Sequence, residues 1–342
     1  MSWRFATLAD VLHVSSTVLS IREDVRYQQV MLRPYPQGLV LKAVKSGLEF
    51  PKKRQKLVRS GQFVISRTHT RRNLWGIVPP PLDGAVLSYY HLIFNLHPDL
   101  NPDYFAAYLA APMFKQAVLG ACGGSRNRLL LQEFQRIALP LPPADIQAAI
   151  AEVWRYANAA RTHTAEMFTA IAEAKAGVTA DWFRETKPSW ERRTLGECAQ
   201  IGRGLAGEVV LTVISADQIV LGEVETSENT VGIVPGIELD GSYLYYLLEH
   251  QKAALRSQLS AAAPRFEVVL QALPLAVPTL YEQRKIAAIL QQHDETLLRI
   301  KAEQTALRKL TQGIMQSIFS GTLNLEQIIP LLRQFTTTSA PT

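Results

Sequence analysis

The sequence repeats itself, and this feature constrains the fold more than any other. The segment LPLPPADIQAAIAEVW at 139–154 matches LAVPTLYEQRKIAAIL at 275–290, and upstream DYFAAYLAAP at 103–112 matches SYLYYLLEHQ at 242–251. Two matches in the same order along the chain indicate a structural unit that occurs more than once. We therefore expect two copies of one unit, each with a variable body, a tyrosine-rich helix, an apolar strand ending in proline, and a long helix. The second copy is shorter, and the loss falls in its variable body.

Each copy ends in a long segment that we expect to be helical, at 143–185 and 281–323. Apolar or small residues recur there at intervals of three, four and seven, which is the pattern of a coiled-coil seam. A narrow seam on a long helix needs a partner, and the chain contains two such seams. We therefore expect the two helices to pack as an antiparallel coiled coil; the alternative is two independent amphipathic helices, each on its own domain. The predicted seam residues are Ile150, Val153, Ala157, Met167 and Ile171 in the first helix and Ile286, Ile289, Ile300, Leu307 and Ile314 in the second.

The two bodies differ in charge. Residues 1–142 carry 18 Lys and Arg against 8 Asp and Glu, whereas residues 190–280 carry 6 against 11, within a chain of net charge +6. Both bodies contain short apolar or β-branched runs bounded by Gly, Pro or Asp, together with helical segments, so we expect mixed α/β modules. The fold class is α+β. The tail at 324–342 is expected to be partly disordered.

The cations of the basic module fall in three clusters. Loops rich in Arg, Asn, Ser and Thr contact nucleic-acid phosphates, and Arg and Asn also contact base edges. The alternative is that these clusters are the solvated surface of a basic protein. The predicted DNA-binding residues are Lys52, Lys53, Arg54 and Lys56; Arg67, His69, Arg71, Arg72 and Asn73; and Ser125, Arg126, Asn127 and Arg128, with Arg265 as the counterpart of Arg126 in the second copy.

Motifs for catalysis are weak or absent. Asn101-Pro102-Asp103-Tyr104 resembles the Asn-Pro-Pro-Tyr motif of adenine methyltransferases, but Asp replaces a proline and the segment opens the tyrosine-rich helix, so we interpret Asn101 as a helix cap. The glycines at 202–207 fit GxGxxG, yet EVVLTVIS follows, which predicts a strand where a dinucleotide site needs a helix. The sequence has no GxxxxGK[ST], HExxH or GxSxG, and no metal-spaced Cys/His cluster. With no apolar run long enough to span a membrane, we expect a cytoplasmic protein.

One segment of the second copy resembles a known family. Pro-Thr-Leu-Tyr-Glu-Gln-Arg-Lys-Ile-Ala at 278–287 is similar to the Pro-x-x-x-Glu-Gln-x-x-Ile-Ala signature of the specificity subunits of type I restriction–modification systems. The first copy has Ile146 in place of the glutamate but keeps Gln147 and Ile150. The long helix ending in SIFSGTL at 317–323 is also typical of that family, and the tandem organisation extends from residue 3 to about 323.

The resemblance implies two tandem α/β target-recognition domains, 1–142 and 190–280, joined by two spacer helices. In that family each domain reads one half of a split target on double-stranded DNA, and the helix pair sets the gap. Two copies of an adenine methyltransferase subunit using S-adenosylmethionine dock on the specificity subunit, and a motor–nuclease subunit using ATP can join them. The resemblance therefore implies that this chain holds no catalytic residue, metal or cofactor, and that its partners do the chemistry.

The acidic second module departs from this pattern. Lys and Arg contacts to phosphates supply much of the affinity of proteins for DNA, and a module of net charge −5 repels the backbone. We therefore expect the first module to supply most of the DNA affinity. The alternative is a scaffold subunit of a related anti-phage methylation complex that reads DNA mainly through its first module; a lone methyltransferase is a third, remote possibility.

Overall fold

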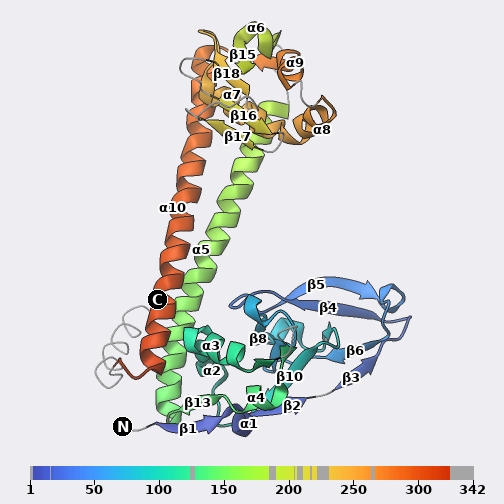
Figure 1. Cartoon of the computed structure of the whole chain (residues 1–342), viewed down its shortest axis with the longest axis vertical. Coiled ribbons are helices and arrows are strands. Elements are labelled where there is room, and N and C mark those ends of the chain that lie inside the picture. Colours follow the sequence, from blue (N-terminus) through green and yellow to red (C-terminus); the bar gives the residue numbers. More distant parts are fainter. Residues whose placement is uncertain are drawn as a thin grey trace, which may run out of the picture. The chain divides into compact units, whose positions relative to one another are not determined.

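The structure is a computed structural model of the whole chain, and it describes residues 3–15, 17–123, 128–184, 190–203, 205, 211–215, 218–221, 231–262 and 266–323. The chain forms two compact units, Met1–Thr162 with Thr305–Thr342, and His163–Gln304. Both mix helices with sheets, and two helices of about forty residues pass from one unit to the other (Figure 1). The predicted α+β class is confirmed, whereas the domain boundaries drawn from the sequence stay predictions. The predicted disordered tail lies outside the described residues.

The body of the first unit is built on two sheets. A four-stranded sheet has the order β2-β10-β7-β8 and a five-stranded sheet the order β3-β6-β9-β4-β5, in which only the described β4–β9 pair is parallel. Strand β7 reads Phe-Val-Ile-Ser and is buried along its whole length, because both of its faces are covered. The strands are β2 Leu12–Ser15, β3 Val18–Ser20, β4 Arg26–Leu32, β5 Leu39–Ser46, β6 Arg54–Leu57, β7 Phe63–Ser66, β8 Trp75–Ile77, β9 Val86–Leu87 and β10 His91–Leu96.

The tyrosine-rich helix of the first unit, α2, packs its aromatic face into the core. Tyr104 and Tyr108 are buried, and Phe63 lies against Phe105 with ring centroids 5.2 Å apart. Asn101 is the N-cap, and its side chain accepts hydrogen bonds from the backbone N–H groups of residues 103 and 104, so the cap interpretation is confirmed. The remaining elements of this unit are β1 Arg4–Thr7, α1 Leu8–Val11, η1 Gly47–Glu49, η2 Thr70–Arg72, η3 Pro80–Leu82, α2 Pro102–Ala110, α3 Pro112–Gly120, β11 Cys122–Gly123, β12 Arg128–Leu129, α4 Leu131–Gln135 and β13 Ala138–Leu141.

The second unit has a smaller body. A four-stranded sheet of order β15-β18-β16-β17 lies beside helices, and Tyr243 and Leu244 of α7 are fully buried in its core. The GxGxxG segment is only partly described, but a strand does follow it, as predicted. The elements are β14 Glu191–Thr194, α6 Leu195–Cys198, β15 Ala199–Arg203, β16 Leu211–Ser215, β17 Gln218–Leu221, β18 Val231–Pro235, α7 Gly241–His250, α8 Lys252–Ala262, α9 Phe266–Gln271 and β19 Pro274–Val277.

The predicted repeat is confirmed by backbone pairing. Strand β1 pairs antiparallel with β13 in the first unit, and β14 pairs antiparallel with β19 in the second. In each unit the turn after the first strand of the pair bonds to the residue before the second strand: Leu8 N–H donates to the Ile137 carbonyl (2.9 Å), and Leu195 N–H to the Leu273 carbonyl (2.8 Å). We call this shared part, with the tyrosine-rich helix and the start of the long helix, the frame.

A buried glutamine at the start of each long helix makes the same three bonds in both frames. In the first, the Gln147 side chain accepts from Asn101 N–H and donates to the carbonyls of Asp99 and Pro142, all at 2.9–3.0 Å.

In the second frame, the Gln283 side chain accepts from Asp240 N–H (2.7 Å) and donates to the carbonyls of Glu238 and Pro278 (2.9 and 2.8 Å). Both glutamines are buried, at 3% and 0% exposure. The glutamine therefore ties the turn before the tyrosine-rich helix to the turn before the long helix, which explains why it aligns across the repeat.

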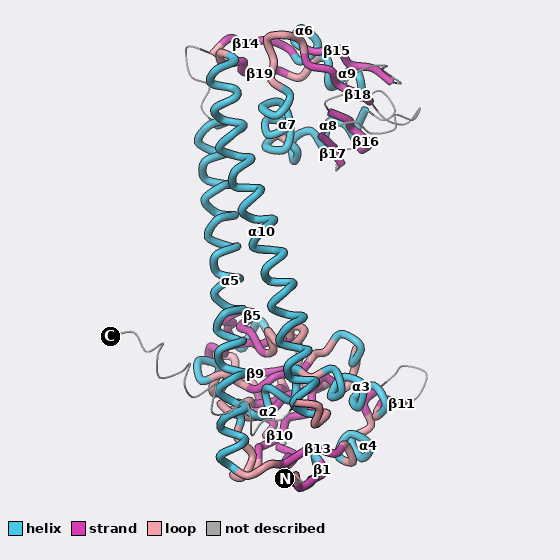
Figure 2. The backbone as a smooth tube through the Cα atoms, turned by 90° about the vertical axis from the view of Figure 1, so that its left-hand side faces the viewer, coloured by secondary structure: helices cyan, strands magenta, loops and turns pink. Residues whose placement is uncertain are grey.

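The long helices are α5, Ala144–Arg184, and α10, Leu280–Phe319, and they pack antiparallel, as predicted (Figure 2). In the first unit the start of α5 shares a buried cluster with the end of α10, through Trp154 and Met315. In the second unit the end of α5 lies beside the first half of α10, since Lys175 of α5 pairs with Asp294 of α10 (Nζ to Oδ1, 2.5 Å).

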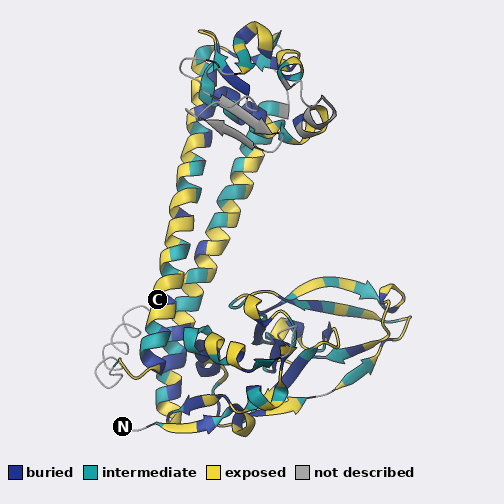
Figure 3. Ribbon diagram, viewed as in Figure 1, coloured by how far each residue is buried: buried dark blue, intermediate teal, exposed yellow. Residues whose placement is uncertain are grey.

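The predicted seam needs one correction, at Met167, whose side chain is 40% exposed. The buried residue is Thr164, at 5% exposure, whose carbonyl accepts a hydrogen bond from the Gln304 side chain (3.0 Å). Thr164 lies one heptad after Ala157 and one before Ile171, so the seam passes through it. The apolar pattern missed it because threonine is polar. The other predicted seam residues are buried or half-buried. Figure 3 shows buried and intermediate residues alternating with exposed ones along both long helices. None of the helices in the described part of the chain could span a membrane.

Candidate nucleic-acid interface

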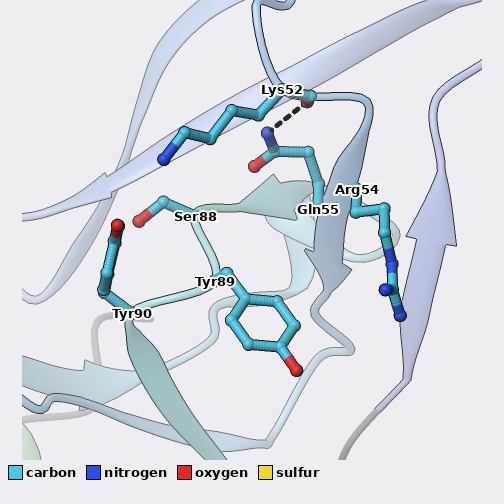
Figure 4. Close-up of a pocket in the computed structure, with 6 residues that line it drawn as sticks. All are labelled: Lys52, Arg54, Gln55, Ser88, Tyr89 and Tyr90. Atoms are coloured by element: carbon cyan, nitrogen blue, oxygen red, sulfur yellow. Dashed lines mark hydrogen bonds between the residues drawn. The ribbon is translucent and has the colours of Figure 1, made fainter.

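The first predicted cation cluster lies at the start of β6, beside a loop that carries two exposed tyrosines. Strand β6 pairs with β9 so that Lys56 lies opposite Leu87, and the loop Ser88–Tyr90 follows directly (Figure 4). Tyr89 and Tyr90 are 56% and 54% exposed. We call the set Lys52, Arg54, Lys56, Arg67, Tyr89 and Tyr90 the basic–tyrosine surface.

The lysines of this surface lie over the tyrosine rings. Lys52 Nζ is 5.3 Å from the centroid of Tyr90, and Lys56 Nζ is 5.2 Å from that of Tyr89, both within the range of cation–π attraction. A cavity of about 320 Å³ opens between them, lined by Lys52, Arg54, Gln55, Ser88, Tyr89 and Tyr90. The Gln55 side chain donates to the Lys52 carbonyl (2.8 Å), which holds the turn that presents both cations (Figure 4).

Lys56 is the electrostatic centre of the surface. Its Nζ donates to the His91 carbonyl (2.8 Å), and its pKa is lowered, first by burial and then by the nearby guanidinium of Arg67. The pKa of His91 is also lowered, by burial and by Lys56, against a hydrogen bond with Ser88 that raises it. Lys56 and Arg67 therefore lie close together, and neither forms an ion pair with a described acidic residue. Such a site favours an anion, and tyrosine rings beside it favour a ligand with flat or polar groups.

Arg67 joins the loop to the next strand. Its backbone N–H donates to the Tyr90 carbonyl (3.2 Å), and its own carbonyl accepts from Leu129 N–H (3.0 Å). The Arg67 Nε is buried and has no hydrogen-bond partner among the described residues. The loop after β7, the tyrosine loop and β12 therefore meet at one place, which brings the exposed Arg128 beside the surface.

Charges in the second unit are arranged differently. Arg193 pairs with Glu238, Arg203 Nε lies 2.6 Å from Glu267, and Lys252 Nζ lies 3.1 Å from Glu249. The hydrogen bond with Glu238 raises the pKa of Arg193. These cations are neutralised within their own module, whereas no ion pair to a described residue is found for Lys52, Arg54 or Lys56. Among the described residues, no group of three or more His, Cys, Asp or Glu could hold a metal ion.

No protein-family model matches the sequence, and no curated protein matches it significantly. Solved structures do match. The type I restriction–modification S subunit from M. genitalium superposes with a TM-score of 0.62 at 12% identity, covering 93% of this chain and 96% of that one. A chain from a structural study of complex assembly and conformational transition in a type I R-M system gives a TM-score of 0.51 at 18% identity, covering 94% and 98%. The chain has the type I specificity-subunit fold.

A third match, the HsdS subunit from Thermoanaerobacter tengcongensis, covers 94% of this chain and 97% of that one at 19% identity, with a TM-score of 0.44. The fold assignment depends on the first two. Both span almost the whole length of this chain and of their own, so the specificity-subunit fold extends over both units rather than over one module. The family resemblance found in the sequence is thus confirmed at the level of the fold.

Within the specificity-subunit fold, the other predicted DNA-binding residues take several positions. Lys53 is already engaged within the protein, since its Nζ donates to the Gly47 carbonyl (3.0 Å) and pairs with Glu23 (3.1 Å). His69, Arg71 and Arg72 are exposed on and before η2. Asn73, by contrast, is half-buried and lines a second cavity. Ser125, Arg126, Asn127 and Arg265 lie outside the described residues. None of these assignments to DNA is tested by the fold, and all stay predictions.

Sequence reasoning missed the two tyrosines. GAVLSYYHLIF at 84–94 is one continuous apolar and aromatic run, typical of a single strand, in which neighbouring side chains alternate between faces and a Tyr-Tyr pair is unremarkable. The structure breaks this run into β9 and β10 with Ser88–Tyr90 as the loop, so both rings are exposed together. The only signal available was the serine between two apolar runs, which is a weak indication of a turn.

Proposed function

We propose that this chain is the sequence-specific DNA-recognition subunit of a type I restriction–modification-like complex, directing partner adenine methyltransferase and nuclease subunits to a two-part DNA target. The observation that carries the proposal is the basic–tyrosine surface on the body of a specificity-subunit fold. Three cations without described acidic partners surround two exposed rings, and that combination suits a phosphate backbone with bases beside it.

In this proposal the residues of the surface have distinct roles. Lys52 and Arg54 are exposed and contact phosphates, since long cationic side chains reach the backbone from a strand end. Arg67 is partly buried, and its Nε has no hydrogen-bond partner among the described residues, so this donor is available to a ligand. Its guanidinium is therefore the best candidate for a base contact, because arginine makes bidentate contacts to guanine.

The chain itself is proposed to be non-catalytic. Two copies of the methyltransferase subunit would bring S-adenosylmethionine, and a motor–nuclease subunit would bring ATP. The fold supports this role, since one structural neighbour comes from a study of the assembly of a type I R-M system. Such a complex would act on DNA in the cytoplasm.

The charges of the second module favour a second candidate function for the chain. Its cations Arg193, Arg203 and Lys252 are engaged by acidic residues of the same module. In this version the chain is a scaffold of an anti-phage methylation complex and reads DNA mainly through its first module. The two candidates differ in whether the methylated target has one part or two.

The proposal is tested by binding of the full chain to a random-sequence duplex, followed by fluorescence anisotropy at several salt concentrations. The triple variant Lys52→Gln, Arg54→Gln, Lys56→Gln should lower the slope of log K against log salt by about 2 to 3, because each lost phosphate contact removes about 0.9. A matched control, Lys285→Gln, Arg299→Gln, Lys309→Gln, removes three exposed cations of α10 and should leave the slope unchanged. Equal losses of slope in the two variants would contradict the assignment of the basic–tyrosine surface to DNA binding.

The role in a complex is tested by co-expression with an adenine methyltransferase subunit that co-purifies with the chain. Mapping of methylated adenines should show a target that disappears when the chain is omitted. A two-part target supports the first candidate, and a one-part target the second. Methylation that is the same without the chain contradicts both.

A further inference from the structure

A second cavity in the first unit shares no residue with the basic–tyrosine surface. It measures about 270 Å³ and lies where the body meets α3, the start of α5 and the end of α10. The body supplies Tyr35, Asn73 and Trp75, and the helices supply Trp154 and three cations described below. A ligand here would contact four separate elements of one compact unit.

One side of the cavity is aromatic. Tyr35 lies between two indoles, with its ring 6.4 Å from Trp75 and 6.0 Å from Trp154, at interplanar angles of 28° and 14°. The Tyr35 hydroxyl donates to the Ala106 carbonyl (2.5 Å), and its backbone N–H donates to the Asn73 carbonyl (2.8 Å), which fixes the ring in place. The three rings form a rigid apolar wall, which suits a flat aromatic group.

Two polar atoms on this wall are buried without a partner. The indole Nε1 of Trp75 and the side-chain Oδ1 of Asn73 have no hydrogen-bond partner among the described residues. Asn73 is held in the left-handed conformation (φ 55°), which asparagine tolerates better than most residues. Buried polar atoms are almost always paired in native proteins. An unmatched indole donor and an unmatched amide oxygen, both on residues that line the cavity, therefore indicate that a polar edge of a ligand completes the site.

The opposite side is cationic. Lys115 of α3, Arg161 of α5 and Arg308 of α10 all line the cavity, and none of its described lining residues is acidic. Lys115 and Arg308 are exposed and have no ion pair with a described residue. Arg161 is half-buried and donates to the Asn158 side chain (2.7 Å), and burial lowers its pKa. Three cations and no acidic side chain among the described lining residues favour an anionic group at this end.

We propose that this cavity binds a nucleotide, with the base against the Tyr35–Trp75–Trp154 wall and the phosphate among Lys115, Arg161 and Arg308. A purely apolar ligand would leave the indole donor and the amide unmatched, and a bare phosphate would leave the aromatic wall empty. The nucleotide can be a free mononucleotide or the exposed nucleotide of a single strand, since both present the same groups. Because it would touch the body and both long helices, it would brace the first module on the helix pair.

The test uses the full chain with AMP as the probe, measured by quenching of tryptophan fluorescence and by calorimetry. AMP should saturate a single site more tightly than either adenosine or inorganic phosphate. Arg308→Gln should weaken AMP binding about tenfold or more, because it removes a charge-assisted contact. Lys309→Gln, the adjacent exposed residue that does not line the cavity, should leave it unchanged.

A second variant and a second probe separate the outcomes. Trp75→Phe keeps an aromatic ring, though a smaller one, and removes the indole donor; it should weaken AMP more than inorganic phosphate, and thermal unfolding checks that the variant is folded. If a single-stranded dodecamer binds with the same Arg308 dependence while AMP does not, the nucleotide belongs to a strand. Absence of saturation by either probe at about 10 mM, or equal losses in Arg308→Gln and Lys309→Gln, overturns the proposal. The triple variant of the basic–tyrosine surface should retain AMP binding, so this test is independent of the proposed DNA interface.

Discussion

The two units share a frame but differ in their bodies. The buried glutamine, the strand pair and the capped tyrosine-rich helix recur with the same backbone bonds in both. The body of the first unit pairs some cations with acids but leaves Lys52, Arg54 and Lys56 without described acidic partners. In the second unit, Arg193, Arg203 and Lys252 are held by acids of the same module. Duplication therefore preserved the residues that hold the frame together and left the surface charge free to change.

The physical reason for this difference lies in burial. A buried glutamine that bonds three backbone groups cannot be replaced without leaving those groups unpaired, so both frames need it. A charge on an exposed strand or loop costs little to gain or lose. The frame is thus specified by local hydrogen bonding, and function in the two units can diverge without loss of the fold.

The largest expected effect compares the two frame glutamines. Gln147→Met and Gln283→Met each leave one N–H and two carbonyls without a partner in a buried site, and each should lower the free energy of unfolding by about 3 kcal/mol. The measurement is urea unfolding of the full chain. Exposed Gln292→Met is the control and should change stability by less than about 0.5 kcal/mol. A large cost in one copy only would break the claim of a shared frame.

Removing one tyrosine hydroxyl from each frame tests the same comparison, with a smaller expected loss of stability. The hydroxyl of Tyr104 donates to the Pro140 carbonyl, and that of Tyr243 donates to the Ala276 carbonyl (2.8 Å). Tyr104→Phe and Tyr243→Phe should each cost about 1 kcal/mol, the usual contribution of one hydrogen bond. Tyr156, which is 54% exposed, serves as the control for the same substitution. Unequal costs beyond the error of thermal unfolding would show that the two frames are held differently.

The body of the first unit offers a smaller effect on DNA. Tyr89→Leu removes the ring that positions Lys56 for a phosphate. It should weaken DNA binding a few-fold, since an exposed cation–π contact contributes about 0.5 to 1 kcal/mol to holding the lysine in place. Tyr281→Leu, at a residue that is 77% exposed on α10, is the matched control. If anisotropy titrations give the two variants the same affinity for DNA, the assignment of Tyr89 to the interface is contradicted.

The smallest effect concerns pH. Folding lowers the pKa of His91, mainly through burial, so the folded state favours the neutral ring. The resulting stability is complete above the unfolded pKa of about 6.5 and is lost as the pH falls through the folded pKa. Unfolding free energy should therefore decrease as the pH falls below about 6.5, and His91→Gln should flatten that decrease. A slope that His91→Gln leaves unchanged contradicts the assignment.

Much of the fold was predictable because it is encoded by periodic patterns. The offset between the two copies of the glutamine segment predicted the repeat, and the heptad spacing predicted two long helices packed antiparallel. The seam was less predictable at Met167, because the residue that is buried there, Thr164, is polar. The spacing of apolar residues predicts which apolar side chains are buried. It does not predict a position at which a threonine is buried in the contact between the two helices.

The site was predictable only in its charges. The Lys52–Lys56 cluster was visible as a run of cations, but Tyr89 and Tyr90 became exposed through a loop that the sequence does not mark. Asn73 was assigned to DNA on residue type alone, whereas the structure places it on the aromatic wall of a cavity. Which cation has an acidic partner depends on residues distant in the chain, such as Arg203 and Glu267, and no local pattern reports this.

The most direct test of the account compares salt-dependent DNA binding of two full-length triple variants. One removes Lys52, Arg54 and Lys56, and the other removes Arg192, Arg193 and Lys252 of the second unit, each by substitution with glutamine. We predict that the first loses about 2 to 3 from the slope of log K against log salt and the second less than about 1. Equal losses, or a larger loss in the second, would contradict the claim that the first module supplies most of the DNA affinity.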